Sequence, residues 1–98
     1  MYNYLENDNL AIGQLDRALQ HYHETIRIAE SAGDLFDAAS TRYNVALTLG
    51  SVGRFADARD YALAALRNFQ TYGASAQEQV QDTLDLIARI DKAASSRS

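Results

Sequence analysis

Apolar side chains recur at intervals of three and four positions along most of the chain, which is the spacing that places them on one face of an α-helix. Four such stripes follow one another from Gln14 onward, and glycines separate them. Glycine is favoured just past the end of a helix because it adopts positive φ angles without strain. We therefore predict four helices, at residues 14–32, 35–52, 54–72 and 75–94.

The two ends of the chain carry weaker patterns. Residues 1–13 contain apolar side chains at helical spacing, but a polar cluster at residues 6–9 interrupts them. We predict a short or frayed helix there. Residues 95–98 have no apolar side chain to bury and are expected to form a disordered tail. Residues 1–94 then form a single domain of about five helices.

Two polar residues mark expected helix starts. Asp34 follows Gly33 and can accept hydrogen bonds from the free N–H groups of the helix that begins after it. Ser75 followed by Glu78 matches a capping box, in which each side chain bonds the backbone N–H of the other residue.

Composition narrows the class of protein. The 98 residues include no proline and five glycines, which favours uninterrupted helices over a sheet with many turns. The absence of cysteine excludes disulfides, thiolate zinc sites and thiol nucleophiles. A net charge of −4 argues against binding to nucleic acid, which needs a basic surface. The apolar runs are too short to span a bilayer and the start lacks a signal-peptide pattern, so we expect a cytoplasmic protein and no membrane partner.

The sequence repeats itself after forty positions. This interval separates two pairs of glycines, Gly13 from Gly53 and Gly33 from Gly73. The same shift places Ala18 on Ala58 and superimposes the surrounding apolar stripes. Matched turns and matched core spacings indicate a repeated helical hairpin.

The segment GRFADARDYALAAL, residues 53–66, resembles the core of a tetratricopeptide repeat, a helical hairpin that stacks into arrays. Four small residues follow that pattern, with Ala46 in the first helix, Gly53 in the turn, and Ala58 and Ala65 in the second helix. The resemblance implies an all-α fold, a right-handed superhelical array of antiparallel helical hairpins.

The chain differs from the usual family pattern in the length of its repeat and at several positions, and its last predicted helix forms only half a unit. The usual unit is about 34 residues, and the longer spacing here is similar to an extended variant common in large bacterial signalling and regulatory proteins. Glu6 stands where the first unit should have a small residue, and proline is missing from the ends of the units. The last predicted helix supplies half a unit with a polar outer face, as a terminal helix needs. We therefore expect the C-terminal end of a longer array.

The resemblance also implies a binding groove, because the first helix of each hairpin lines the concave face of such arrays. Five residues of the helix at 35–52 would face the groove as peptide-binding candidates: Ser40, Tyr43, Asn44, Leu47 and Ser51. Family members that bind extended peptides often use an asparagine at the place of Asn44, because its amide both donates to and accepts from a peptide backbone. The alternative is that Asn44 caps or bridges neighbouring helices, and the sequence favours neither reading.

One known partner class of the family is not expected. The family's carboxylate clamp holds the acidic C-termini of heat-shock chaperones with two amides and three cations. Asn7 and Asn44 match the two amides, but the three cationic positions fall on Asn3, Val80 and Leu84, none of which is basic.

No set of residues indicates catalysis, a cofactor or a metal. His21 and His23 point about 200° apart on a helix, so they cannot reach one ion, and we interpret them as packing or solvated side chains. No serine–histidine–aspartate set, paired carboxylates or phosphate loop stands out. We therefore expect a binding module rather than an enzyme.

The predicted function is the binding of a protein or peptide in a concave groove. Two alternatives stay open. The segment could be an oligomerisation element that forms a homodimer through its N-terminal side. It could also be the terminal part of a ligand-sensing array in a larger signalling ATPase or effector protein.

Overall fold

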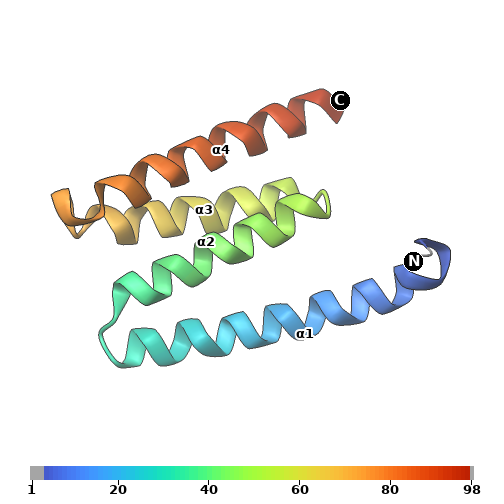
Figure 1. The fold of residues 1–98 in the computed structure, drawn as a ribbon, viewed down its shortest axis with the longest axis horizontal. Helices are drawn as coiled ribbons and strands as arrows, with labels where there is room; N and C mark the ends of the chain where they lie inside the picture. Colours follow the sequence, from blue (N-terminus) through green and yellow to red (C-terminus); the bar gives the residue numbers. More distant parts are fainter. Residues whose placement is uncertain (1–3, 98) are drawn as a thin grey trace.

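The computed structural model describes the backbone of residues 4–97 and the side chains of residues 13–96. The described residues form four α-helices and one short 3-10 helix, and they contain no strand. The elements are α1 (Tyr4–Ser31), α2 (Leu35–Ser51), α3 (Phe55–Gln70), η1 (Gly73–Ala76) and α4 (Gln77–Arg97). Figure 1 shows each α-helix running back beside the one before it, from α1 at the bottom to α4 at the top. The predicted all-α array of helical hairpins is confirmed.

The turns after α1 and α2 are closed in the same way. Gly33 has a φ of 77°, and the N–H of the next residue, Asp34, donates to the carbonyl of Ala29 at 2.8 Å. This Schellman motif satisfies carbonyls that the helix end leaves free. The turn after α2 has the same bonds around Gly53, whose φ is 84°. These two glycines end their helices as predicted.

Gly13 behaves differently from its partner under the forty-residue shift. It lies inside α1, which continues without a break from Tyr4 to Ser31, and its φ is not positive. The prediction of a separate helix over residues 1–13 is therefore wrong for residues 4–13. A glycine inside a helix costs only about 1 kcal/mol relative to alanine, and the apolar spacing after Gly13 favours continuation. The predicted helix at residues 14–32 is the C-terminal part of this longer helix.

The two predicted helix starts have different outcomes. The Asp34 carboxylate accepts a hydrogen bond from the N–H of Asp37 at 3.0 Å, so it caps α2 as expected. Ser75 lies inside η1, and α4 begins two residues later at Gln77. The predicted capping box therefore does not open α4, because the 3-10 turn begun by Gly73 occupies its place. At the other end α4 reaches Arg97, so the prediction of a disordered tail is wrong for residues 95–97.

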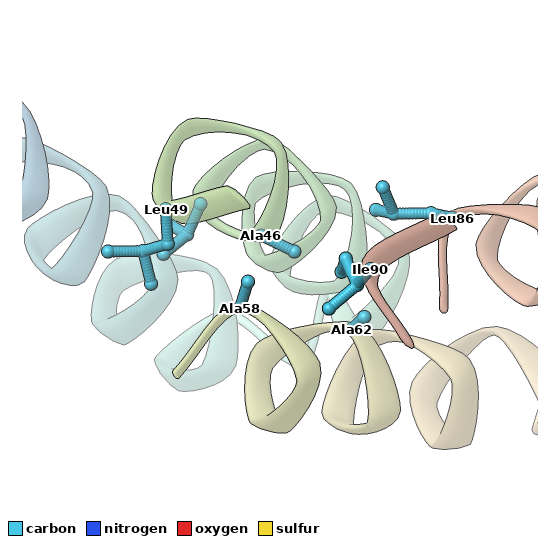
Figure 2. Close-up of a cluster of buried hydrophobic side chains, with 7 residues drawn as sticks. Ala46, Leu49, Ala58, Ala62, Leu86 and Ile90 are labelled. Atoms are coloured by element: carbon cyan, nitrogen blue, oxygen red, sulfur yellow. The ribbon is translucent and has the colours of Figure 1, made fainter. Parts of the chain in front are cut away.

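The main core lies where α2, α3 and α4 meet. Its buried members are Val45, Ala46 and Leu49 from α2, Ala58 and Ala62 from α3, and Leu86 and Ile90 from α4. Figure 2 shows the small side chains of Ala46, Ala58 and Ala62 where the helices approach, with the larger ones around them. Small residues allow the backbones to come close, and the large residues fill the remaining space. Ala46 and Ala58, two of the small residues of the repeat pattern, are both buried at this crossing.

A second cluster ties the start of α2 to the end of α3. Phe36 packs edge-on against both Phe69 and Tyr72, with ring centroids 5.3 and 5.4 Å away. The backbone N–H of Phe36 also donates to the phenolic oxygen of Tyr72 at 2.7 Å. This bond satisfies one of the free N–H groups in the first turn of α2.

Arg42 joins three helices through its guanidinium group. From α2 it donates to Glu30 of α1 at 2.8 Å and to Asn68 of α3 at 2.7 Å. Its side chain is only 17% exposed, so these polar groups are partly removed from water and hydrogen-bonded to one another. The contact ties both α1 and α3 to α2.

Candidate functional site

A groove runs between α2 and α4. Neighbouring helices in the chain are antiparallel, so α2 and α4 point the same way, and both pack on α3. Residues about forty positions apart therefore lie opposite each other across the groove. Its surface has two hollows, one near the N-terminal ends of the two helices and one near their C-terminal ends.

The first hollow has a volume of about 140 Å³. Six residues from three helices line it: Ser40, Tyr43 and Asn44 from α2, Phe69 from α3, and Gln79 and Asp82 from α4. The Phe69 side chain is buried and the others are half-buried or exposed. The hollow therefore combines aromatic surface with polar groups that remain open to solvent.

The second hollow has a volume of about 210 Å³ and is more apolar. Its lining residues are Ala46, Leu47, Gly50 and Ser51 from α2, Phe55 from α3, and Leu86, Arg89, Ile90 and Ala93 from α4. Leu47 is 40% exposed, so it offers apolar surface within this hollow. Arg89 is the charged residue of this hollow.

All five residues predicted from the sequence lie along this groove. Ser40, Tyr43 and Asn44 line the first hollow, and Leu47 and Ser51 line the second. The residues that sequence reasoning missed lie opposite them on α4, chiefly Gln79, Asp82 and Arg89. The forty-residue repeat did indicate that residues 79–93 of α4 lie beside α2. These residues were not chosen because the last helix was interpreted as a terminal cap.

The side-chain amide of Asn44 is exposed and forms no hydrogen bond within the part of the chain that the structure describes. Its backbone carbonyl accepts from Thr48 at 2.9 Å, as part of the ordinary α2 pattern. The alternative in which Asn44 bridges neighbouring helices therefore has no support among the described contacts.

The ion pairs of the structure lie outside the groove. Four ion pairs occur among the described residues, Arg27–Glu24, Arg42–Glu30, Arg54–Asp57 and Arg59–Asp91. None of these residues lines either hollow. Asp82 and Arg89 do line them, and within residues 13–96 neither forms an ion pair. These two charges are therefore available to a bound molecule.

Comparison with known proteins identifies the repeat. A family model described as a tetratricopeptide repeat matches residues 3–71. The chain belongs to the tetratricopeptide repeat family. Comparison with curated proteins and with solved structures gives no significant match. Tetratricopeptide repeats generally mediate protein–protein interaction and are non-catalytic modules.

The family assigns roles to the helices. The hairpin of α2 and α3 carries the quoted repeat pattern, and α1 corresponds to α3 under the forty-residue shift. The match ends at residue 71, but α4 packs on α3 and lies parallel to α2, as the first helix of a following repeat would. The groove thus lies between the first helix of the matched hairpin and a helix outside the match that packs in the same way on α3.

One of the two histidines, His23, has a packing role in this array. His23 shares a hydrogen bond between its Nε2 atom and the hydroxyl of Tyr61, and the two rings stack with centroids 6.0 Å apart. The contact links α1 to α3. The described residues contain no group of three or more histidines and acids that could hold a metal ion, and no described helix is long and apolar enough to cross a membrane.

Proposed function

We propose that this tetratricopeptide repeat binds an extended peptide segment of a partner protein in the groove between α2 and α4. The observation that carries the proposal is the exposed amide of Asn44 beside that of Gln79, on opposite walls of the first hollow. A primary amide presents both a donor and an acceptor, so each can bond a peptide group whatever the peptide's sequence. The aromatic surface of Tyr43 adds apolar contact area next to these amides.

The two hollows suit a peptide better than a small molecule. They are shallow and lie in line along parallel helices, with polar groups at one end and apolar groups at the other. A small-molecule site is usually one deeper pocket that encloses most of its ligand. An extended peptide can place successive side chains in successive hollows.

Selection from a phage-displayed library of random peptides tests this function. Synthetic copies of the enriched peptides should bind the wild-type chain, and Asn44→Ala should weaken binding by about tenfold, the cost of leaving peptide groups unpaired. Gln70→Ala is the matched control because it removes an exposed amide from α3, away from the groove. Equal binding by both variants would contradict the proposal.

A second candidate function is self-association. Among the described elements α1 packs mainly on α2, with one side-chain contact to α3 at His23, and Ile28 is 61% exposed. This surface could join a second copy of the chain. A setting within a larger cytoplasmic signalling protein is compatible with either function, and it is supported only by the resemblance of the forty-residue spacing to bacterial arrays.

A further inference from the structure

The first hollow combines the chemical groups that bind an organic cation. We propose that it is a pocket for one lysine or arginine side chain of the bound peptide, an inference that rests on the function proposed above. Asp82 supplies a carboxylate, and the half-buried ring of Tyr43 supplies aromatic surface beside the buried ring of Phe69. Cations are attracted both to carboxylates and to the faces of aromatic rings.

The polar lining of this hollow favours a cation over an anion because it contains no cationic side chain. Ser40, Asn44 and Gln79 offer oxygen atoms that accept hydrogen bonds from an ammonium or guanidinium group. None of their side chains is bonded to another described residue. With a volume of about 140 Å³, and at about 30 Å³ for each water molecule in the liquid, the hollow has room for a single long side chain.

Neighbouring charges increase the preference for a cation. Glu78 and Asp85 lie one turn on either side of Asp82 on α4, and both are exposed. The nearest arginine on α2, Arg42, is engaged by Glu30 and Asn68 and does not line the groove. An acidic peptide side chain entering this hollow would therefore meet carboxylates without a compensating cation.

The distance between the two hollows determines how far apart in the peptide sequence the two bound side chains lie. Asp82 and Arg89 are seven residues apart on α4, which is about 10 Å along a helix. An extended peptide advances about 3.3 Å per residue, so side chains about three positions apart reach the two hollows. We therefore expect a basic residue in the first hollow and an apolar residue about three positions away, beside Leu47 and Leu86, where Arg89 disfavours a second cation.

The experiment uses the enriched peptides from the phage selection described above. They should share one basic position with an apolar residue about three positions from it. Replacing the basic residue by norleucine, which keeps the aliphatic stem but removes the charge, should weaken binding by about tenfold because both the ion pair and the cation–π contact are lost. The affinity of the parent peptide should fall with added salt.

The matching change in the protein is Asp82→Asn. It should weaken binding of the parent peptide by about fivefold and leave binding of the norleucine peptide almost unchanged. Asp60→Asn is the control, since Asp60 is exposed on α3, lines neither hollow and carries the same charge. Equal losses for both peptides, or for both variants, would overturn the cation pocket.

The outcomes separate this inference from the function on which it rests. Peptides that lose affinity with Asn44→Ala but show no basic position would support groove binding and overturn the cation pocket. Peptides unaffected by Asn44→Ala would overturn both. A nuclear magnetic resonance titration gives an independent test without any selected peptide. Nα-acetyl-lysine amide should shift the side-chain amide signals of Asn44 and Gln79, and Nα-acetyl-norleucine amide should not; equal shifts would overturn the proposal.

Discussion

The phenolic oxygen of Tyr72, at the end of α3, accepts a hydrogen bond from the backbone N–H of Phe36 in the first turn of α2, with 2.7 Å between the two atoms. The ring of Tyr72 also packs edge-on against that of Phe36. One side chain thus supplies an apolar contact and also binds the backbone of a helix at a residue 36 positions earlier in the chain.

This double role predicts the effect of Tyr72→Phe. The variant keeps the ring and removes the acceptor, so it should lower the free energy of unfolding by about 0.5–1.5 kcal/mol. Urea denaturation measures the change. Tyr43→Phe is the control because the Tyr43 hydroxyl has no hydrogen bond to another described residue. Equal stabilities of the two variants would show that the cap contributes nothing.

Two glycines of the same turn region should respond to alanine in opposite directions. At Gly50, inside α2, a Cβ atom would lie 3.9 Å from Ile90 and 4.0 Å from Ala58, which is ordinary contact. Gly50→Ala should therefore raise the free energy of unfolding by about 0.5–1 kcal/mol. Gly53 has a φ of 84°, so Gly53→Ala should lower it by about 1–2 kcal/mol. Thermal melting of both variants tests the pair, and shifts of the same sign would contradict it.

The close crossing of α2 and α3 predicts an overpacking effect. Ala58 is fully buried within the main core. Ala58→Leu should lower the free energy of unfolding by about 1–3 kcal/mol because no space exists for the added atoms. Ala56→Leu, on the exposed side of α3, makes the same change in solvent. An unchanged melting midpoint for Ala58→Leu would mean that the alanine is not at an interhelical contact.

We expect the isolated chain to form a dimer through its N-terminal side. The apolar side chains first proposed for that contact, Tyr2, Tyr4, Leu5, Leu10 and Ile12, lie outside the described side chains. The described part of α1 adds Ile28, which is 61% exposed, to a helix covered mainly by α2. Large uncovered apolar surfaces are rare on monomers. Light scattering at micromolar concentration should give twice the chain mass of 10.8 kDa, and Ile28→Lys should shift the equilibrium toward monomer. A wild-type mass of 10.8 kDa would contradict the expectation.

The parts of the fold that sequence predicted are those determined within one or two turns of chain. Gly33 and Gly53 could be recognised because each stands where an apolar stripe ends, and Asp34 because it stands directly before the next stripe. Gly13 has the same identity and spacing but lies within a continuous helix. At Gly33 and Gly53 the positive φ accompanies a turn closed by the N–H of the next residue, whereas the helix continues through Gly13.

The groove also has one wall that could be predicted from the sequence and one that could not. The α2 wall was predictable because its residues follow one helical period. The α4 wall was not, because the forty-residue shift places Gln79 and Asp82 on Ala39 and Arg42, which do not line the groove. Their position depends on η1, which sets where α4 begins and how it is rotated on α3. The sequence around Ser75 indicated a different start for that helix, so the residues facing the groove could not be chosen from the pattern.

The two hydrogen bonds of Arg42 affect how the helices of this molecule unfold locally. Repeat arrays are held mainly by contacts between neighbouring helices, so their ends can fray one helix at a time. Arg42 lies on the middle helix of three and bonds both flanking ones. Detachment of either α1 or α3 leaves a partly buried guanidinium group with one partner fewer, which weakens its hold on the other. The amide hydrogens of α1, α2 and α3 should therefore exchange with solvent as one cooperative unit, while those at the C-terminal end of α4 exchange earlier.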